Sequence, residues 1–246
     1  MGSEAASAVD SAAWLAALDA AAASNHWDEV RRGLHRLDRD MAAWPAMDRA
    51  SALRQLWRWR MRAAELWWQP LRSASMTLRR TRADDANFYS QCFESPDFKR
   101  RFNRQVPWTG DLAQALAQAG AGSPLDQRAI HWIIEIEPSH RVGLASLTSI
   151  SMANARAVVS LGFPGQVPPL LGAMAMLLIY DFAFFKLGLN KLSSCVYTSN
   201  AEALHNSRRV GLRQEGELKD HFYLPPGEFV DVYVMGLTRA QLQADD

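Results

Sequence analysis

A glutamate inside an alternating strand pattern is the residue of this 246-residue chain whose type and position most suggest acid–base chemistry. Over 129–137, apolar side chains recur at every second position, and this period of two places Glu135 on the face opposite Trp132. A carboxylate partly buried in a cleft has a raised pKa and can take a proton from an ammonium group. The alternative is a solvated strand face on which Glu135 pairs with Arg141, and the sequence leaves both open.

The sequence contains no visible set of residues spaced to bind a metal ion. The two cysteines, Cys92 and Cys195, lie in unrelated segments, and neither belongs to a CxxC motif or to a Cys/His spacing suited to zinc. We therefore expect two reduced thiols and no metal.

Charge does not favour a nucleic-acid or membrane partner. The formal net charge is +1, which gives no global field to attract a polyanion. In Trp57-Arg58-Trp59-Arg60, apolar residues fall at helical spacing with arginines on another face. We interpret this segment as a helix docked on its own domain or on a second subunit. No nucleic-acid partner is expected.

A change of composition near Ser73 divides the chain. The residues before it are rich in Ala, Arg and Trp, which favours helices at about 10–23, 26–41 and 47–68. We predict a helical extension over 1–72 and a second domain over 73–246. These helices could form a homodimer interface.

Neither a signal peptide nor a membrane span is expected. The first 24 residues lack a basic segment. The most apolar stretch, 170–185, contains Asp181 and is too short to cross a bilayer. A cytoplasmic location is the resulting expectation.

After Pro70 the patterns alternate between strand and helix. A short strand at 76–82 and helices at about 84–92 and 111–120 come first. The remaining expected elements are strands 129–137, 141–151 and 155–163, helix 170–187, strand 191–198, helix 201–210, and strands 212–223 and 228–237. The order β-β-β-α-β-α-β-β predicts an α/β (α+β) domain with a mixed sheet.

Four segments in this order resemble the GNAT (Gcn5-related N-acetyltransferase) superfamily, in the branch of ribosomal-protein and sugar-amine acetyltransferases. Met76–Asp85 resembles its first strand and Asp-capped helix, and Val142–Leu147 with Asn154–Ala157 resembles its hairpin. Phe184–Leu192 resembles the FxxLGLxKv motif. Asn200 followed by Val210–Leu218 resembles the most specific segment, xN…GFxxEGxL, with Asn200 eleven residues before Gly211.

The resemblance implies a GNAT fold, a splayed central sheet flanked by helices, with the helical extension added. It implies an acyltransferase that moves an acyl group, acetyl by expectation, from acyl-CoA to a primary amine of a small molecule or sugar nucleotide. A protein N-terminal acetyltransferase is one alternative. A carrier-protein-dependent acyltransferase or a catalytically silent binding module is another.

The resemblance also places the donor between the strands that end near Phe163 and Thr198. The pyrophosphate would rest on backbone N–H groups at the start of the next helix. The residues expected to bind the cofactor are Gly162, Phe163, Leu171, Gly172, Ala173, Met174, Asn200 and Asn206. The family's Gln/Arg-x-x-Gly-x-Gly/Ala turn is here Val167-Pro168-Pro169-Leu170-Leu171-Gly172, in which only the final glycine matches and two prolines remove N–H donors.

For catalysis, the resemblance points to Asn200 and Ser207 beside Glu135. Asn200 would contact the thioester or pantetheine arm, or act only as a helix N-cap. Ser207 stands where many members have a tyrosine that protonates the leaving thiolate. Asp220, His221 and Tyr223 could orient the amine, with Asp220 the fallback base, or they could simply serve the turn before Pro225-Pro226.

Overall fold

The computed structural model describes residues 11–24, 26, 29, 32–33, 67–102, 110–136, 139–151, 154–168, 170–224 and 227–244. The contacts divide the chain into two compact units, Met1–Trp67 and Trp68–Asp246. In the first unit, α1 (Ser11–Ala23) matches the first expected helix. The expected helices at 26–41 and 47–68, and the homodimer attributed to them, fall largely outside the described residues. The domain boundary after residue 72 stays a prediction.

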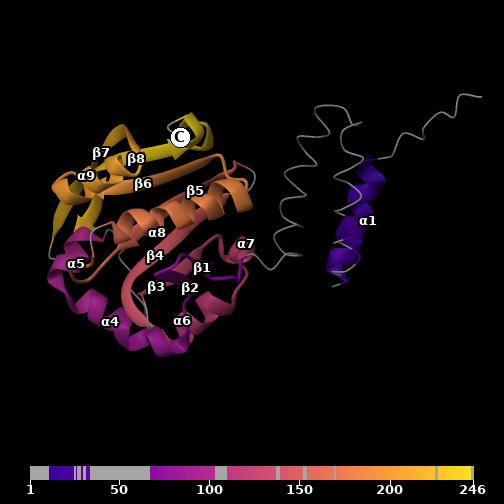
Figure 1. Cartoon of the computed structure of the whole chain (residues 1–246), viewed down its shortest axis with the longest axis horizontal. Coiled ribbons are helices and arrows are strands. Elements are labelled where there is room, and N and C mark those ends of the chain that lie inside the picture. The colour runs from indigo at the N-terminus through magenta and orange to yellow at the C-terminus, as the bar shows by residue number, and fades with distance from the viewer. Residues whose placement is uncertain are drawn as a thin grey trace, which may run out of the picture. The chain divides into compact units, whose positions relative to one another are not determined.

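The second unit is built on a sheet of eight strands in the order β1-β2-β3-β4-β5-β6-β8-β7 (Figure 1). All neighbouring strands are antiparallel except β5 and β6, so the predicted mixed sheet is confirmed. The strands are β1 (Leu71–Arg72), β2 (Met76–Arg80), β3 (Ile130–Ile136), β4 (His140–Ser151), β5 (Arg156–Gly162), β6 (Lys191–Tyr197), β7 (Arg213–Leu224) and β8 (Glu228–Thr238). The two-residue β1 has no counterpart among the strands that the sequence pattern predicted.

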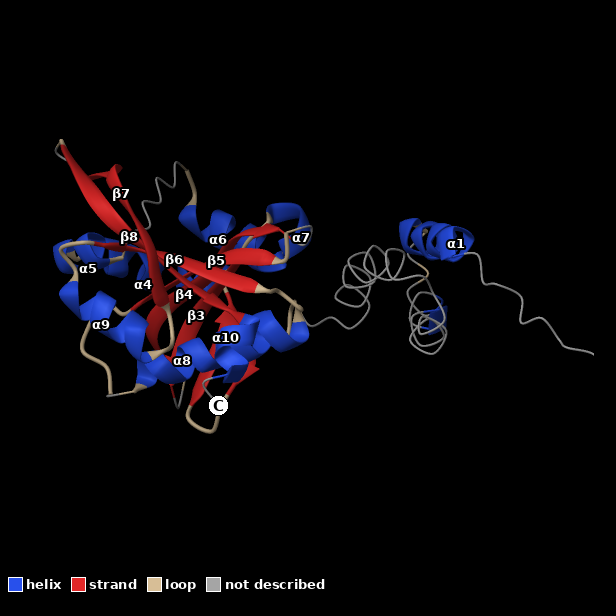
Figure 2. Ribbon diagram, turned by 90° about the horizontal axis from the view of Figure 1, so that it is seen from above, coloured by secondary structure: helices blue, strands red, loops and turns tan. Residues whose placement is uncertain are grey.

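Helices cover both faces of the sheet, and Figure 2 shows α6 and α8 on opposite sides. Asp111 caps α6 by accepting from Gln114 N–H at 3.1 Å, and Ser95 caps α5 in the same way. The helical elements are η2 (Ala83–Asp85), α4 (Ala86–Glu94), α5 (Pro96–Arg101), α6 (Leu112–Ala121), α7 (Pro124–Gln127), α8 (Leu171–Tyr180), the π-helical turn η3 (Asp181–Lys186), α9 (Ala201–Arg209) and α10 (Arg239–Ala244). The short α5, α7 and α10 were not predicted, because segments of four to six residues are too short to show a helical period.

The alternation on β3 builds a core on each side of the sheet. Trp132 packs edge-on against Phe182 at 5.7 Å between ring centroids, on the side of α8. Ile133 faces the other way, into an aromatic cluster contributed by α4, α5 and α6. That cluster comprises Tyr89, Cys92, Phe98, Phe102 and Leu116, with Leu144 from β4.

Strands β5 and β6 stay together over only three residue pairs. Arg156–Val158 pair with Lys191–Ser193, and no pairing follows. Beyond that point β5 remains bonded to β4 as far as Gly162, and β6 remains bonded to β8 as far as Tyr197. The two carboxyl ends therefore separate, as the predicted splay requires.

A buried carboxylate ties the start of α4 to the sheet. Asp85, whose side chain is fully buried, accepts from both terminal nitrogens of Arg79 at 2.8 and 2.7 Å. It also accepts from the backbone N–H of Arg82 at 2.7 Å and contacts Arg141 Nε at 2.9 Å. The Asp85 hydrogen bonds are the main reason why the pKa of Arg79 is raised. One carboxylate thus fastens η2 to strands β2 and β4.

We expect Asp85→Asn to lower the free energy of unfolding by about 3–5 kcal/mol, because it leaves two poorly hydrated guanidiniums without their buried counter-charge. The matched control is Asp84→Asn. Asp84 also pairs with Arg141, at 2.7 Å, but its side chain is 63% exposed, so the cost should stay below about 1 kcal/mol. Urea unfolding of both variants measures the difference. Equal losses would show that Asp85 is not the anchor.

Candidate functional site

The opening between β5 and β6 leads to the first turn of α8. Leu170 precedes this helix with a φ of +69°, and the N–H of Leu171 donates to Pro168 C=O at 3.2 Å. The N–H of Met174 is bonded within the helix, to Leu170 C=O at 2.9 Å. Helix geometry leaves the amides of Gly172 and Ala173 without an intrahelical acceptor. An anion would meet the positive end of the helix dipole at these two amides.

Three glycines allow close packing around the end of β5. A side chain at Gly162 would overlap the ring of Phe102. The absence of a side chain at this position therefore lets α5 pack against β5. The ring of the next residue, Phe163, lies 3.5 Å from the position of a Cβ at Gly172 and 2.6 Å from one at Gly143. Phe163 therefore occupies the space between β4 and the start of α8. Gly162, Phe163 and Gly172 meet at one end of the opening.

Asn200 is the residue that caps the start of α9, and Ser207 lies within this helix. The side chain of Asn200 accepts from Ala203 N–H at 3.0 Å, which makes it the N-cap that the sequence allowed. Seven residues separate it from half-buried Ser207, or about 10 Å along the axis on nearly the same face. Asn206 is exposed. The cap uses the Asn200 carbonyl oxygen, so its side-chain NH₂ is the group left to contact a ligand.

Tyr197 is a candidate that the sequence patterns did not single out. It is the last residue of β6, beyond the point where pairing with β5 ends, and only 2% of it is exposed. Among the described residues its hydroxyl has no hydrogen-bond partner, whereas buried Tyr180 donates to Val210 C=O at 3.0 Å. Burial raises the pKa of Tyr197 to about 12. Buried polar groups are rarely left unbonded, so a ligand is one group that could satisfy this hydroxyl. In the sequence, the only indication of this residue is that a tyrosine stands three positions before Asn200.

Glu135 lies in a different part of the sheet. Its carboxylate accepts from Arg79 Nε at 2.9 Å, and its side chain is 16% exposed. Arg141 is its neighbour across the β3–β4 ladder, yet that guanidinium bonds to Asp84 and contacts Asp85. Strands β4 and β5 separate β3 from β6, a span of about 14 Å. The structure therefore does not bring Glu135 together with Asn200, and its role as base stays a prediction.

The hairpin of β7 and β8 carries the expected acceptor residues. Asp220, His221 and Tyr223 are all exposed on β7, the edge strand of the sheet. Asp220 adopts a φ of +48° at an irregular stretch of the ladder, and its N–H donates to Asp231 at 2.8 Å. A hydrogen bond from Lys219 is the main cause of a lowered pKa at Asp231. These side chains face solvent.

The described residues include no group of three or more His, Cys, Asp or Glu side chains placed to hold a metal ion. Within the same residues, no helix is long and apolar enough to cross a membrane. Both cysteines are thiols, and burial raises the pKa of Cys92 to about 12.

Comparison with known proteins agrees with this geometry. The sequence model of the acetyltransferase (GNAT) domain matches residues 75–213. No curated protein matches the chain. Among solved structures, spermidine N-acetyltransferase from Vibrio cholerae in complex with CoA and spermine is similar at a TM-score of 0.58 and 19% identity, over 70% of this chain and 99% of that one. Ribosomal-protein-S5-alanine acetyltransferase from Vibrio fischeri is similar at a TM-score of 0.59 and 15% identity, over 69% and 96%.

At these identities the two structures show the fold, while the domain match shows the family. The match spans more than half of the chain and includes β5, the opening beside it, and α8. The GNAT resemblance of the four motifs is thereby confirmed. The chain belongs to the GNAT acetyltransferase family and is an acetyl-CoA-dependent N-acetyltransferase.

Proposed function

We propose that the enzyme acetylates a primary amine of a small molecule, such as a polyamine or an amino sugar nucleotide. The observation that carries the donor half of this proposal is the open edge of β5 beside the first-turn amides of α8. Pantetheine amides can pair with an open strand edge as an added strand would. The pyrophosphate then rests at Gly172 and Ala173. The prolines before α8 leave this contact possible, since backbone amides supply it.

The acceptor half of the proposal rests on a relative and on the exposed hairpin. The Vibrio cholerae spermidine N-acetyltransferase was solved with CoA and spermine, a small amine. The exposed carboxylate of Asp220 and the rings of His221 and Tyr223 offer a surface on which a cationic amine could be oriented. The similar ribosomal-protein-S5-alanine acetyltransferase favours a protein N-terminus as the second candidate.

An acceptor panel separates these candidates. Acetyl-CoA is incubated with the full chain and, in turn, spermidine, an amino sugar nucleotide or an alanine-starting peptide, and released CoA is measured through its thiol. We expect release above the hydrolysis background with at least one small amine. Release with the peptide alone would establish the second candidate. Acetyl-CoA at 100 times its Kd should also stabilise the fold by about 2.7 kcal/mol. Stabilisation by acetyl-CoA without release in the presence of any small amine would overturn the proposed acceptor class.

A glycine substitution tests the donor position. We expect Gly172→Val to weaken CoA binding about tenfold, because a β-branched side chain would intrude where the backbone must approach the phosphates. The fold should tolerate the change, since the new Cβ lies at an ordinary contact distance of 3.5 Å from Phe163. Gly216→Val on β7 is the matched control, as its Cβ would have no heavy atom within 4 Å. Calorimetry measures both, and equal affinities would remove Gly172 from the donor site.

The chemistry requires two proton transfers. The amine nitrogen attacks the thioester carbonyl carbon, the C–S bond breaks, and the thiolate leaves as CoA. The nitrogen must lose one proton, and the thiolate gains one. Glu135 is our proposed base. Because β4 and β5 separate its strand from β6, the proton would reach its carboxylate through water molecules, and that carboxylate is also bonded to Arg79. Tyr197 is our proposed donor to the thiolate, because its neutral phenol lies at the end of β6. Ser207 is the alternative donor.

Two conservative variants examine these roles. Tyr197→Phe removes only a hydroxyl without a partner in the described structure, so it should lower kcat about tenfold with no loss of stability. Glu135→Gln should lower turnover at least about tenfold while CoA affinity stays near wild type, and the loss should shrink as pH rises. Pre-steady-state kinetics and urea unfolding give both readouts. Wild-type turnover in Tyr197→Phe would exclude its hydroxyl. If Glu135→Gln lowers stability but leaves the pH–rate profile unchanged, then Glu135 serves the ion pair with Arg79 and is not the base.

A further inference from the structure

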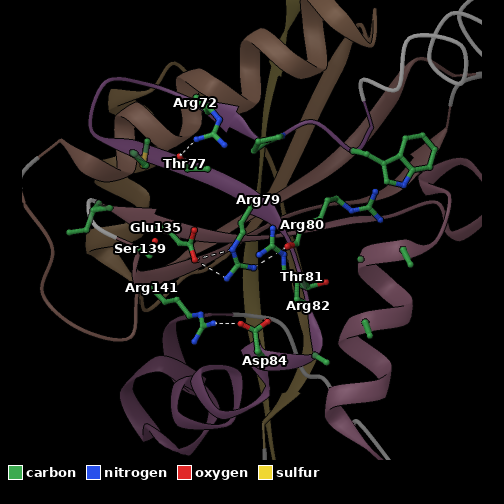
Figure 3. Close-up of a pocket in the computed structure, with 18 of the residues that line it drawn as sticks. Arg72, Thr77, Arg79, Arg80, Thr81, Arg82, Asp84, Glu135, Ser139 and Arg141 are labelled. Atoms are coloured by element: carbon green, nitrogen blue, oxygen red, sulfur yellow. Dashed lines mark hydrogen bonds and ion pairs between the residues drawn. The ribbon is translucent and has the colours of Figure 1, made fainter.

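A second hollow lies away from the β5–β6 opening, beside the edge of the sheet formed by β1 and β2. Its volume is about 840 Å³, and arginines from four separate segments line it (Figure 3). They come from β1, β2, the turn before η2, and β4. These arginines are Arg72, Arg79, Arg80, Arg82 and Arg141. We call this cavity the arginine hollow.

Three of these guanidiniums are held by the protein itself. Arg79 bonds to Asp85 and Glu135, and Arg141 to Asp84 and Asp85. Arg80 is buried and donates to the backbone carbonyls of Ala119 and Gly122, at 2.6 and 2.9 Å. Burial lowers its pKa to about 10, so it stays charged at neutral pH. These contacts fix the walls of the arginine hollow.

Arg72 and Arg82 are more available. Both are exposed, and the hydrogen bond shown for the Arg72 side chain is to a neutral hydroxyl, Thr77 Oγ1 at 3.3 Å. In the described part of the chain, five arginines face three carboxylates here: Asp84, Asp85 and Glu135. Two positive charges are therefore left over, which is the charge that a small dianion or polyanion would neutralise.

We propose that the arginine hollow binds a small molecule that carries phosphate groups. A guanidinium presents paired N–H donors that match phosphate oxygens, and several guanidiniums from different strands favour more than one phosphate. The volume lies within the usual range for ligand pockets. The hydroxyls of Thr77 and Ser139 add neutral donors, and the 40%-exposed indole of Trp68 provides a flat apolar surface at the lining. This ligand is separate from the acetyl donor, because β3 and β4 lie between β2 and β5.

The experiment measures binding and does not depend on acetyl transfer. The probes are inorganic tripolyphosphate, which carries phosphates alone, and ATP, which adds a base. Each is titrated into the full chain by calorimetry at fixed ionic strength, with one equivalent of CoA present so that the donor site is occupied and no excess CoA competes for the arginine hollow. We expect both probes to bind, and ATP to bind more tightly if Trp68 stacks on the base.

Arg72→Gln and Arg82→Gln should each weaken binding about tenfold, since each removes one available charge. Arg156→Gln is the matched control: an exposed arginine on β5 that does not line the arginine hollow. Urea midpoints verify that all three variants fold. Three outcomes would overturn the proposal: no binding of either probe to the protein that holds one equivalent of CoA, wild-type affinity in both hollow variants, or an equal loss in Arg156→Gln. An equal loss in Arg156→Gln would mean that the probes are attracted by positive charge anywhere on the surface, and not by the arginine hollow.

Discussion

The end of the β5–β6 pairing after three residue pairs is the constraint on which the rest of the structure depends. Beyond Val158 and Ser193 each strand is bonded only on its outer side, so the inner edges present unpaired N–H and C=O groups. Buried backbone groups must find partners, and an extended amide chain such as pantetheine can provide them. The same separation makes room for the start of α8. In our proposal, the donor binds where these two strands are no longer paired with each other.

Small residues and rings set the shape of that opening. Gly162 lets Phe102, the residue after α5, approach the strand, and Phe163 fills the space between Gly143 and the first turn of α8. In the proposed donor site the phosphate contact is made by backbone amides, so a loop with other side chains can still offer the same donors. We propose the amides of Gly172 and Ala173 for that contact.

Arg79 links the fold to the arginine hollow. Its guanidinium joins Asp85 at the start of α4 to Glu135 on β3, and it also lines the cavity beside β1 and β2. A charge added in that cavity would therefore act on the ion pair that holds Glu135. A bound phosphate and the Glu135 carboxylate would then share one guanidinium, and since both are negatively charged each would weaken the attraction of Arg79 for the other.

The sequence by itself determined the order of strands and helices, the mixed sheet and the family. Those features follow from local patterns: the alternation around Trp132 and Ile133, the cap at Asn200, and four short motifs in a fixed order along the chain. Tertiary structure decided which charges meet. Glu135 bonds to Arg79, 56 residues away, and not to the cross-strand Arg141, because the register shifts between Ile134 and Glu135 and Asp85 draws Arg141 toward η2. The buried hydroxyl of Tyr197 and the gathering of arginines from four segments likewise arise only when distant strands pack, since no local period encodes them.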